Sequence, residues 1–82
     1  MKRPILGITM GDPFGNGPEI TVRSLADETL YDRCRPLVVG DTASMEYAAA
    51  VYNKLTGASI RVHPVQSVQE AHFLFGPIDV LS

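Results

Sequence analysis

Apolar and polar positions alternate along the chain in a pattern that predicts four strands and three helices. Short apolar runs at residues 5–10, 37–39 and 78–81 are typical of buried parallel strands. Residues 60–63 alternate apolar and polar side chains, which predicts a fourth strand with one more polar face. Helices are predicted between these strands, over residues 18–26, 42–55 and 67–73 or 74. This order predicts an α/β fold with a mostly parallel sheet.

The helix over residues 42–55 has the clearest periodicity. Met45, Ala48, Ala49 and Tyr52 follow the i, i+3, i+4, i+7 spacing, so they should form one core-facing stripe. Gly57 then provides a stop. The spacing of Ser67 and Glu70 matches a capping box and predicts the start of the last helix. Residues 27–35 are expected to be a connection with at most one short helical turn.

The segment between the first strand and the first helix contains three glycines within seven residues. It reads Gly-Asp-Pro-Phe-Gly-Asn-Gly-Pro-Glu over residues 11–19. Pro18 suits the first position of a helix, and glycines allow close backbone approach. Because open α/β sheets bind ligands at the carboxyl ends of their strands, this loop is the candidate site.

The chemistry of this loop differs from that of standard phosphate cradles. The glycine spacing is neither that of the dinucleotide fingerprint nor that of the P-loop, and no lysine or arginine occurs within residues 11–19. Asp12 and Glu19 favour a hydroxyl, an amide or a cation as the contacted group, although helix N–H groups could still bind a phosphate. Alternatively, both carboxylates only satisfy N–H groups of the loop and helix.

Three other polar residues are candidates for a functional site. Asp41 follows the second strand, where dinucleotide-binding folds place a ribose-binding carboxylate. A helix cap is favoured, because the first loop lacks the matching fingerprint. His63 and His72 lie nine positions apart without ligand spacing, His72 in the last predicted helix, so packing or surface positions are expected.

Composition excludes several other classes of protein. The 82 residues are 45% hydrophobic and 20% charged with a net charge of −2, which is ordinary for a globular domain. The scattered basic residues form no stripe for nucleic acid. No apolar run is long enough for a membrane span or a signal peptide, and one cysteine allows no internal disulfide. A cytoplasmic protein without nucleic-acid or membrane partners is therefore expected.

Residues 8–20, Ile-Thr-Met-Gly-Asp-Pro-Phe-Gly-Asn-Gly-Pro-Glu-Ile, resemble the N-terminal signature of the 4-hydroxythreonine-4-phosphate dehydrogenase family of pyridoxine biosynthesis. Residues 21–26 and 36–41 resemble that family's first helix and second strand. A related glycine loop occurs in isocitrate and isopropylmalate dehydrogenases, whose fold the family shares. The resemblance implies a three-layer α/β fold with a mostly parallel sheet, of which this chain holds the first βαβαβαβ portion.

The resemblance also implies an activity and a site. The full enzyme would use NAD or NADP and a divalent metal (Zn, Mg, Mn or Co) to oxidise a small phosphorylated hydroxy acid, and would act as a homodimer. The cofactor-binding residues here would be Gly11, Asp12, Gly15, Gly17 and Glu19. Catalytic residues and metal-binding histidines would lie in later segments. Residues 1–82 are accordingly expected to be one N-terminal segment truncated from a two-domain enzyme, inactive alone, and weakly stable or self-associating.

Two departures from the family's usual motif leave alternatives open. Phe14 replaces alanine and Asn16 replaces isoleucine. These changes fit either a subgroup that oxidises phosphorylated threonate or erythronate, or neutral variation. Further alternatives are a self-standing nucleotide- or phosphate-binding module and a non-catalytic scaffold.

Overall fold

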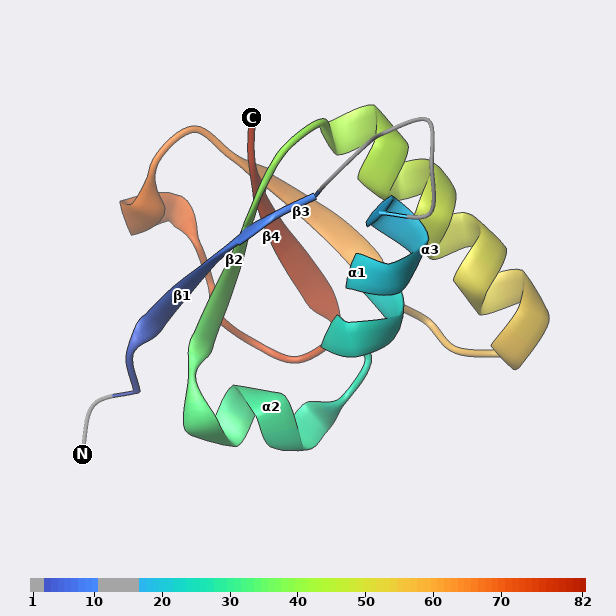
Figure 1. The fold of residues 1–82 in the computed structure, drawn as a ribbon, viewed down its shortest axis with the longest axis horizontal. Helices are drawn as coiled ribbons and strands as arrows, with labels where there is room; N and C mark the ends of the chain where they lie inside the picture. Colours follow the sequence, from blue (N-terminus) through green and yellow to red (C-terminus); the bar gives the residue numbers. More distant parts are fainter. Residues whose placement is uncertain (1–2, 11–16) are drawn as a thin grey trace.

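The strands form one parallel sheet in the computed structural model, which describes residues 3–10 and 17–82. In sheet order they are β1 (Ile5–Thr9), β2 (Arg35–Val39), β4 (Pro77–Leu81) and β3 (Arg61–Val65), as seen in Figure 1. The helices are α1 (Gly17–Leu25), α2 (Glu28–Arg33) and α3 (Thr42–Thr56), and a 3-10 turn, η1, spans Val68–Glu70. The predicted α/β class with a parallel sheet is confirmed.

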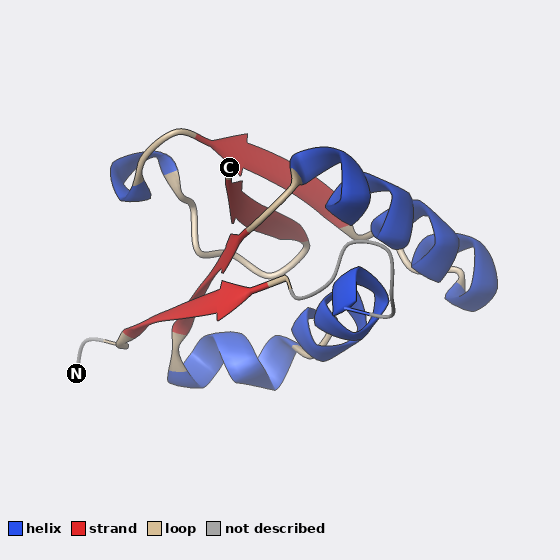
Figure 2. Cartoon of the chain, turned by 45° about the horizontal axis from the view of Figure 1, so that its top comes forward, coloured by secondary structure: helices blue, strands red, loops and turns tan. Residues whose placement is uncertain are grey.

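The order of the strands determines which connection covers which face. The steps from β1 to β2 and from β2 to β3 run in one direction across the sheet, whereas the step from β3 to β4 runs back. Right-handed connections therefore place α1 and α3 on one face and residues 66–76 on the other. Figure 2 shows α1 and α3 together beside the strands, and the η1 segment away from them.

The core lies between the sheet and the two helices α1 and α3. Ile78 and Val80 of β4 point toward these helices, and Asp79 between them points to the opposite face, as the alternation of a strand requires. The most deeply buried large side chains of this core are Val22, Leu25, Val38, Met45, Ile78 and Val80.

Helix α3 forms as its periodicity predicts. Met45, Ala48 and Ala49 are buried, and Tyr52 packs against the same cluster. The helix ends at Gly57, whose φ of 75° lies in the left-handed region that favours glycine. Among the helices that the structure describes, none has the length and apolar character needed to cross a membrane.

The prediction for residues 5–10 was correct for the strand and wrong for its burial. Ile5 and Leu6 are 45% and 46% exposed, because β1 lies at an edge of the described sheet. Residues 27–35 contain more helix than expected, since α2 forms six residues of helix. The Asp27 carboxylate caps this helix by accepting the Thr29 N–H at 3.0 Å.

The prediction of a helix from residue 67 to 73 or 74 was wrong. Only η1 forms, and Ser67 makes no side-chain cap bond to the backbone. The N–H groups of His72 and Phe73 donate to the Asp79 carboxylate, at 3.1 and 2.8 Å, instead of to helical carbonyls. Phe73 also has a φ of 54°, which a right-handed helix does not allow. A tertiary interaction thus overrides the local helix signal.

Candidate functional site

The candidate cofactor loop joins the carboxyl end of β1 to the start of α1. Gly11, Asp12 and Gly15 lie outside the described residues, so their predicted role stays a prediction. Gly17 is the first residue of α1, and its carbonyl accepts the Thr21 hydroxyl at 2.8 Å. Glu19 is exposed in the first turn of α1, where its charge complements the positive end of the helix dipole.

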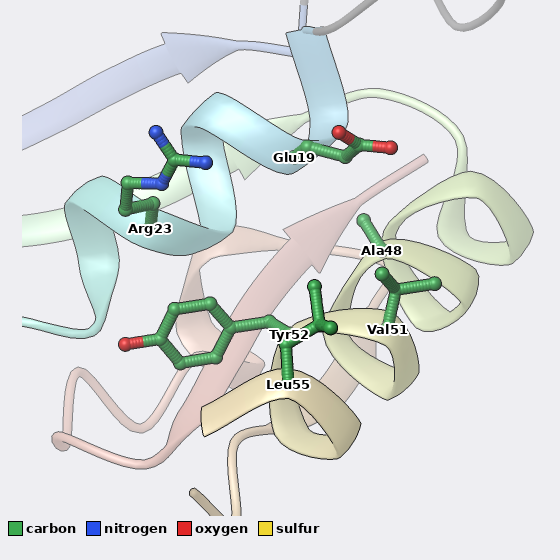
Figure 3. Close-up of a pocket in the computed structure, with 6 residues that line it drawn as sticks. All are labelled: Glu19, Arg23, Ala48, Val51, Tyr52 and Leu55. Atoms are coloured by element: carbon green, nitrogen blue, oxygen red, sulfur yellow. The ribbon is translucent and has the colours of Figure 1, made fainter. Parts of the chain in front are cut away.

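Glu19 also borders a shallow groove between α1 and α3. Figure 3 shows Glu19 and Arg23 on the α1 side and four residues of α3 opposite: Ala48, Val51, Tyr52 and Leu55. The groove has a cavity volume of about 50 Å³ and is apolar along α3. That volume is far below the usual range for small-molecule sites, so the groove alone is too small for a dinucleotide.

Neighbouring backbones meet closely where β1 and β2 end. The N–H of Met10 donates to the Val39 carbonyl at 3.3 Å, and the N–H of Gly40 donates to the Leu81 carbonyl at 3.1 Å. A Cβ atom at Gly40 would lie only 2.7 Å from Met10 Cβ. A side chain at position 40 would clash with Met10, so this position after β2, next to the candidate loop, favours glycine.

Asp41 is a helix cap, as the sequence analysis favoured. Its Oδ2 atom accepts both the N–H and the hydroxyl of Ser44, at 2.8 and 2.6 Å. The Ser44 hydroxyl and then the Ser44 N–H stabilise the carboxylate and lower the pKa of Asp41 below its ordinary value. Capping α3 therefore explains why a carboxylate occurs at position 41, and binding of a ribose is not needed to explain it.

The structure brings together three residues that the sequence analysis did not select as a site. His63 of β3 and Asp79 of β4 are paired across the two strands, and His63 Nδ1 lies 2.8 Å from Asp79 Oδ1. The His72 ring stacks on the His63 ring, with centroids 3.9 Å apart and planes 19° apart. The Asp79 side chain is almost completely buried, whereas His63 is partly exposed.

Only the pairing of the strands could have revealed this cluster. Residues 63 and 79 become neighbours because β3 and β4 pair in parallel, and β4 lies between β2 and β3. No pattern in the sequence predicts that order. Placing His72 in a helix also concealed its approach to Asp79.

Tyr31 of α2 is buried near the same carboxylate. Burial, together with the negative charge of Asp79, raises the pKa of Tyr31 to about 12. The Tyr31 ring meets Phe75 edge to face, with centroids 5.9 Å apart. The segment 66–76 is thereby joined to α2 as well as to the sheet.

Comparisons with known proteins identify relatives over nearly the whole chain. D-threonate 4-phosphate dehydrogenase of Cupriavidus necator is 42% identical over 78 residues, which are 95% of this chain and 22% of that protein. 4-Hydroxythreonine-4-phosphate dehydrogenase of Desulforapulum autotrophicum is 43% identical over 80 residues, which are 98% of this chain and 22% of that protein. No protein-family model matches the chain.

A solved structure supports the same relation. The crystal structure of a 4-hydroxythreonine-4-phosphate dehydrogenase from Burkholderia phymatum superposes with a TM-score of 0.87 at 38% identity. It covers 100% of this chain and 24% of the solved chain.

The fold and its glycine-rich strand-to-helix loop define a parallel α/β segment of the kind found in dehydrogenases. More specifically, the chain is similar over nearly its whole length to a segment of 4-hydroxythreonine-4-phosphate and D-threonate 4-phosphate dehydrogenases, as its resemblance predicted. It spans about 22% of the length of the curated relatives that it matches.

Proposed function

We propose that this chain supplies the glycine-loop wall of a dehydrogenase that oxidises an alcohol of a small phosphorylated hydroxy acid. The observation that carries the proposal is 42–43% identity, over 95–98% of the chain, to relatives named as such dehydrogenases. The proposed cytoplasmic enzyme is a homodimer of longer chains. An 82-residue segment by itself is proposed to be inactive.

The proposed role of residues 11–19 is to face NAD or NADP, which accepts a hydride when it is bound. Support comes from their position between a strand's carboxyl end and a helix start. The exposed Glu19 carboxylate suits a hydroxyl or amide group of the cofactor better than its pyrophosphate. We assign this chain neither a reacting group nor a ligand of the divalent metal that this reaction is proposed to use.

The proposed substrate is 4-phosphohydroxy-threonine, with the oxidation serving pyridoxal phosphate biosynthesis. D-threonate 4-phosphate, or the corresponding erythronate, is the alternative. Sequence identity favours neither, because the two relatives named for these different substrates are 42% and 43% identical to this chain. Both substrates are 4-phosphorylated hydroxy compounds, so the reaction class is the same for either.

A full-length chimera tests this function. In the Cupriavidus necator enzyme, the matching 78-residue segment is replaced with the corresponding residues of this chain, and NADH formation is measured with each substrate. We expect activity, because the exchanged segments share sequence across nearly all of this chain. A folded chimera that turns over neither substrate would contradict the proposal.

Loop variants of the same chimera test the cofactor role. Asp12→Asn and Gly15→Val should raise the KM for NAD, because they alter the charge and the backbone freedom of the loop. Phe14→Ala with Asn16→Ile restores the family's usual residues and serves as the matched control. If the first two variants leave the KM for NAD unchanged, the loop does not face the cofactor.

A further inference from the structure

The side chains of both histidines in the sequence lie close to the buried Asp79 carboxylate, on the face of the sheet opposite α1 and α3. His63 comes from β3, Asp79 from β4, and His72 from the connection between them. One ligand atom from each side chain lies within 4.8 Å of the others. Nothing in the proposed dehydrogenase function uses these residues.

We propose that His63, His72 and Asp79 bind one divalent transition-metal ion, with Zn²⁺ as the ion that these donors suit best. Two imidazole nitrogens and one carboxylate oxygen form a set that binds zinc with a fourth position open to water. The same donors are less suited to Mg²⁺ or Ca²⁺, which prefer oxygen ligands. The partly exposed His63 and the exposed His72 allow an ion to enter from solvent.

The charge at Asp79 favours a cation. Its side chain is only 1% exposed, and in the described part of the chain no lysine or arginine nitrogen lies within 4.0 Å of its oxygens. A buried carboxylate is costly unless it is paired and hydrogen-bonded. The N–H groups of His72 and Phe73 supply hydrogen bonds but no full positive charge, and the His63 imidazole, 2.8 Å away, supplies one only when it is protonated. A bound metal ion would supply that charge.

Asp79 and His63 lie close to the spacing of two ligands of one ion. Two ligands that are each about 2.1 Å from a tetrahedral zinc ion lie about 3.4 Å apart, so the 2.8 Å between His63 Nδ1 and Asp79 Oδ1 has to lengthen slightly. The proton that bonds these atoms would be released, and the ion would bind beside the pair with both atoms turned toward it. The backbone N–H bonds to both Asp79 oxygens would hold the carboxylate in place, as outer-shell hydrogen bonds do in metal sites.

The third ligand requires one movement. The His63 and His72 rings are stacked, so their nitrogen lone pairs do not converge on one point. Because the His72 side chain is exposed, its ring can turn toward the ion while its backbone stays bonded to Asp79. Metal binding should therefore break the stack and link β3, β4 and residues 66–76.

The test combines zinc titration calorimetry of the full 82-residue chain with long-range nitrogen NMR of its imidazoles. Because the sequence has only these two histidines, each imidazole signal reports on this cluster. We expect one Zn²⁺ per chain and coordination shifts at nitrogens of both rings. Absence of zinc binding, or binding that leaves the imidazole signals unchanged, would overturn the proposal.

His72→Gln is the first variant, because it removes an exposed ligand and keeps the backbone N–H bond to Asp79. Zinc affinity should fall at least about tenfold. Gln69→Ala, an exposed change within η1, is the matched control and should bind zinc as the parent chain does. If His72→Gln does not fold, His63→Gln gives the same comparison. Parental affinity in a folded ligand variant would mean that the cluster is only a hydrogen-bonded brace.

Discussion

Gly40 shows how tightly the carboxyl ends of β1 and β2 are packed. A methyl group at this position would lie 2.7 Å from Met10 Cβ and 3.2 Å from Met10 Sδ. Gly40→Ala should therefore lower the free energy of unfolding by about 1–3 kcal/mol, the usual cost of overpacking. Gly7→Ala is the matched control in β1, because a methyl group there meets no described atom within 4 Å. Urea unfolding gives the free energy of unfolding of both variants, and equal values for the two would contradict the prediction.

The buried phenol of Tyr31 predicts a loss of stability at high pH. Its pKa is about 12 in the folded protein and near the ordinary 10.0 in the unfolded chain. Folding thus favours the protonated phenol, so its contribution is complete below pH 10 and is lost as the pH rises toward 12. Between these values, the free energy of unfolding should fall more steeply for the parent chain than for Tyr31→Phe. Parallel curves from urea unfolding would contradict this prediction.

At the residue scale, sequence reasoning succeeded where the interaction is local. Asp41 and Ser44 are three positions apart, so the cap follows from the helix signal itself. It failed for Asp79, whose partners are 6, 7 and 16 positions away. Those contacts depend on strand order and on the path of residues 66–76, which no short pattern specifies.

At the element scale, Asp79 holds residues 66–76 against the sheet. Asp79→Ala would leave the N–H groups of His72 and Phe73 without their acceptor. We expect the free energy of unfolding to fall on the order of 2–4 kcal/mol. Asp41→Ala, which removes only the exposed cap of α3, should cost about 1 kcal/mol. A smaller effect at position 79 than at position 41 in urea unfolding would contradict the prediction.

Helices and strands, like single residues, were predictable from the sequence where their signals are local. Helix α3 was predictable because its stripe, its cap and Gly57 agree. The segment after Ser67 was not, since a capping box there competes with tertiary hydrogen bonds to Asp79. The exposure of β1 was not predictable either, because an apolar run does not indicate whether its strand is central or at an edge.

At the scale of the whole molecule, the exposed edge strand β1 predicts self-association of the chain. Ile5 and Leu6 are both nearly half exposed on a strand with one parallel neighbour, β2, in the described sheet. Such apolar edges pair with other chains. Sedimentation velocity should therefore show an average mass that rises with concentration.

A charged side chain on this edge should reduce the association. Leu6→Lys places a charge on β1, where charged residues oppose edge pairing. Leu55→Lys is the matched control, because Leu55 is 80% exposed on α3, away from the edge. A parent chain that remains monomeric at all concentrations would contradict the prediction, as would equal effects of the two substitutions.

The position of β4 has a consequence for synthesis on the ribosome. This strand is the last of the four to be translated, yet it lies between β2 and β3. While the chain is being made, β1 and β2 can pair early, because they are adjacent in the sheet. Strand β3 has to wait for β4 to emerge from the exit tunnel before it gains a neighbour. The nascent chain therefore holds β3 unpaired until that late step, and the His63 ring and the His72 N–H reach the Asp79 carboxylate only then.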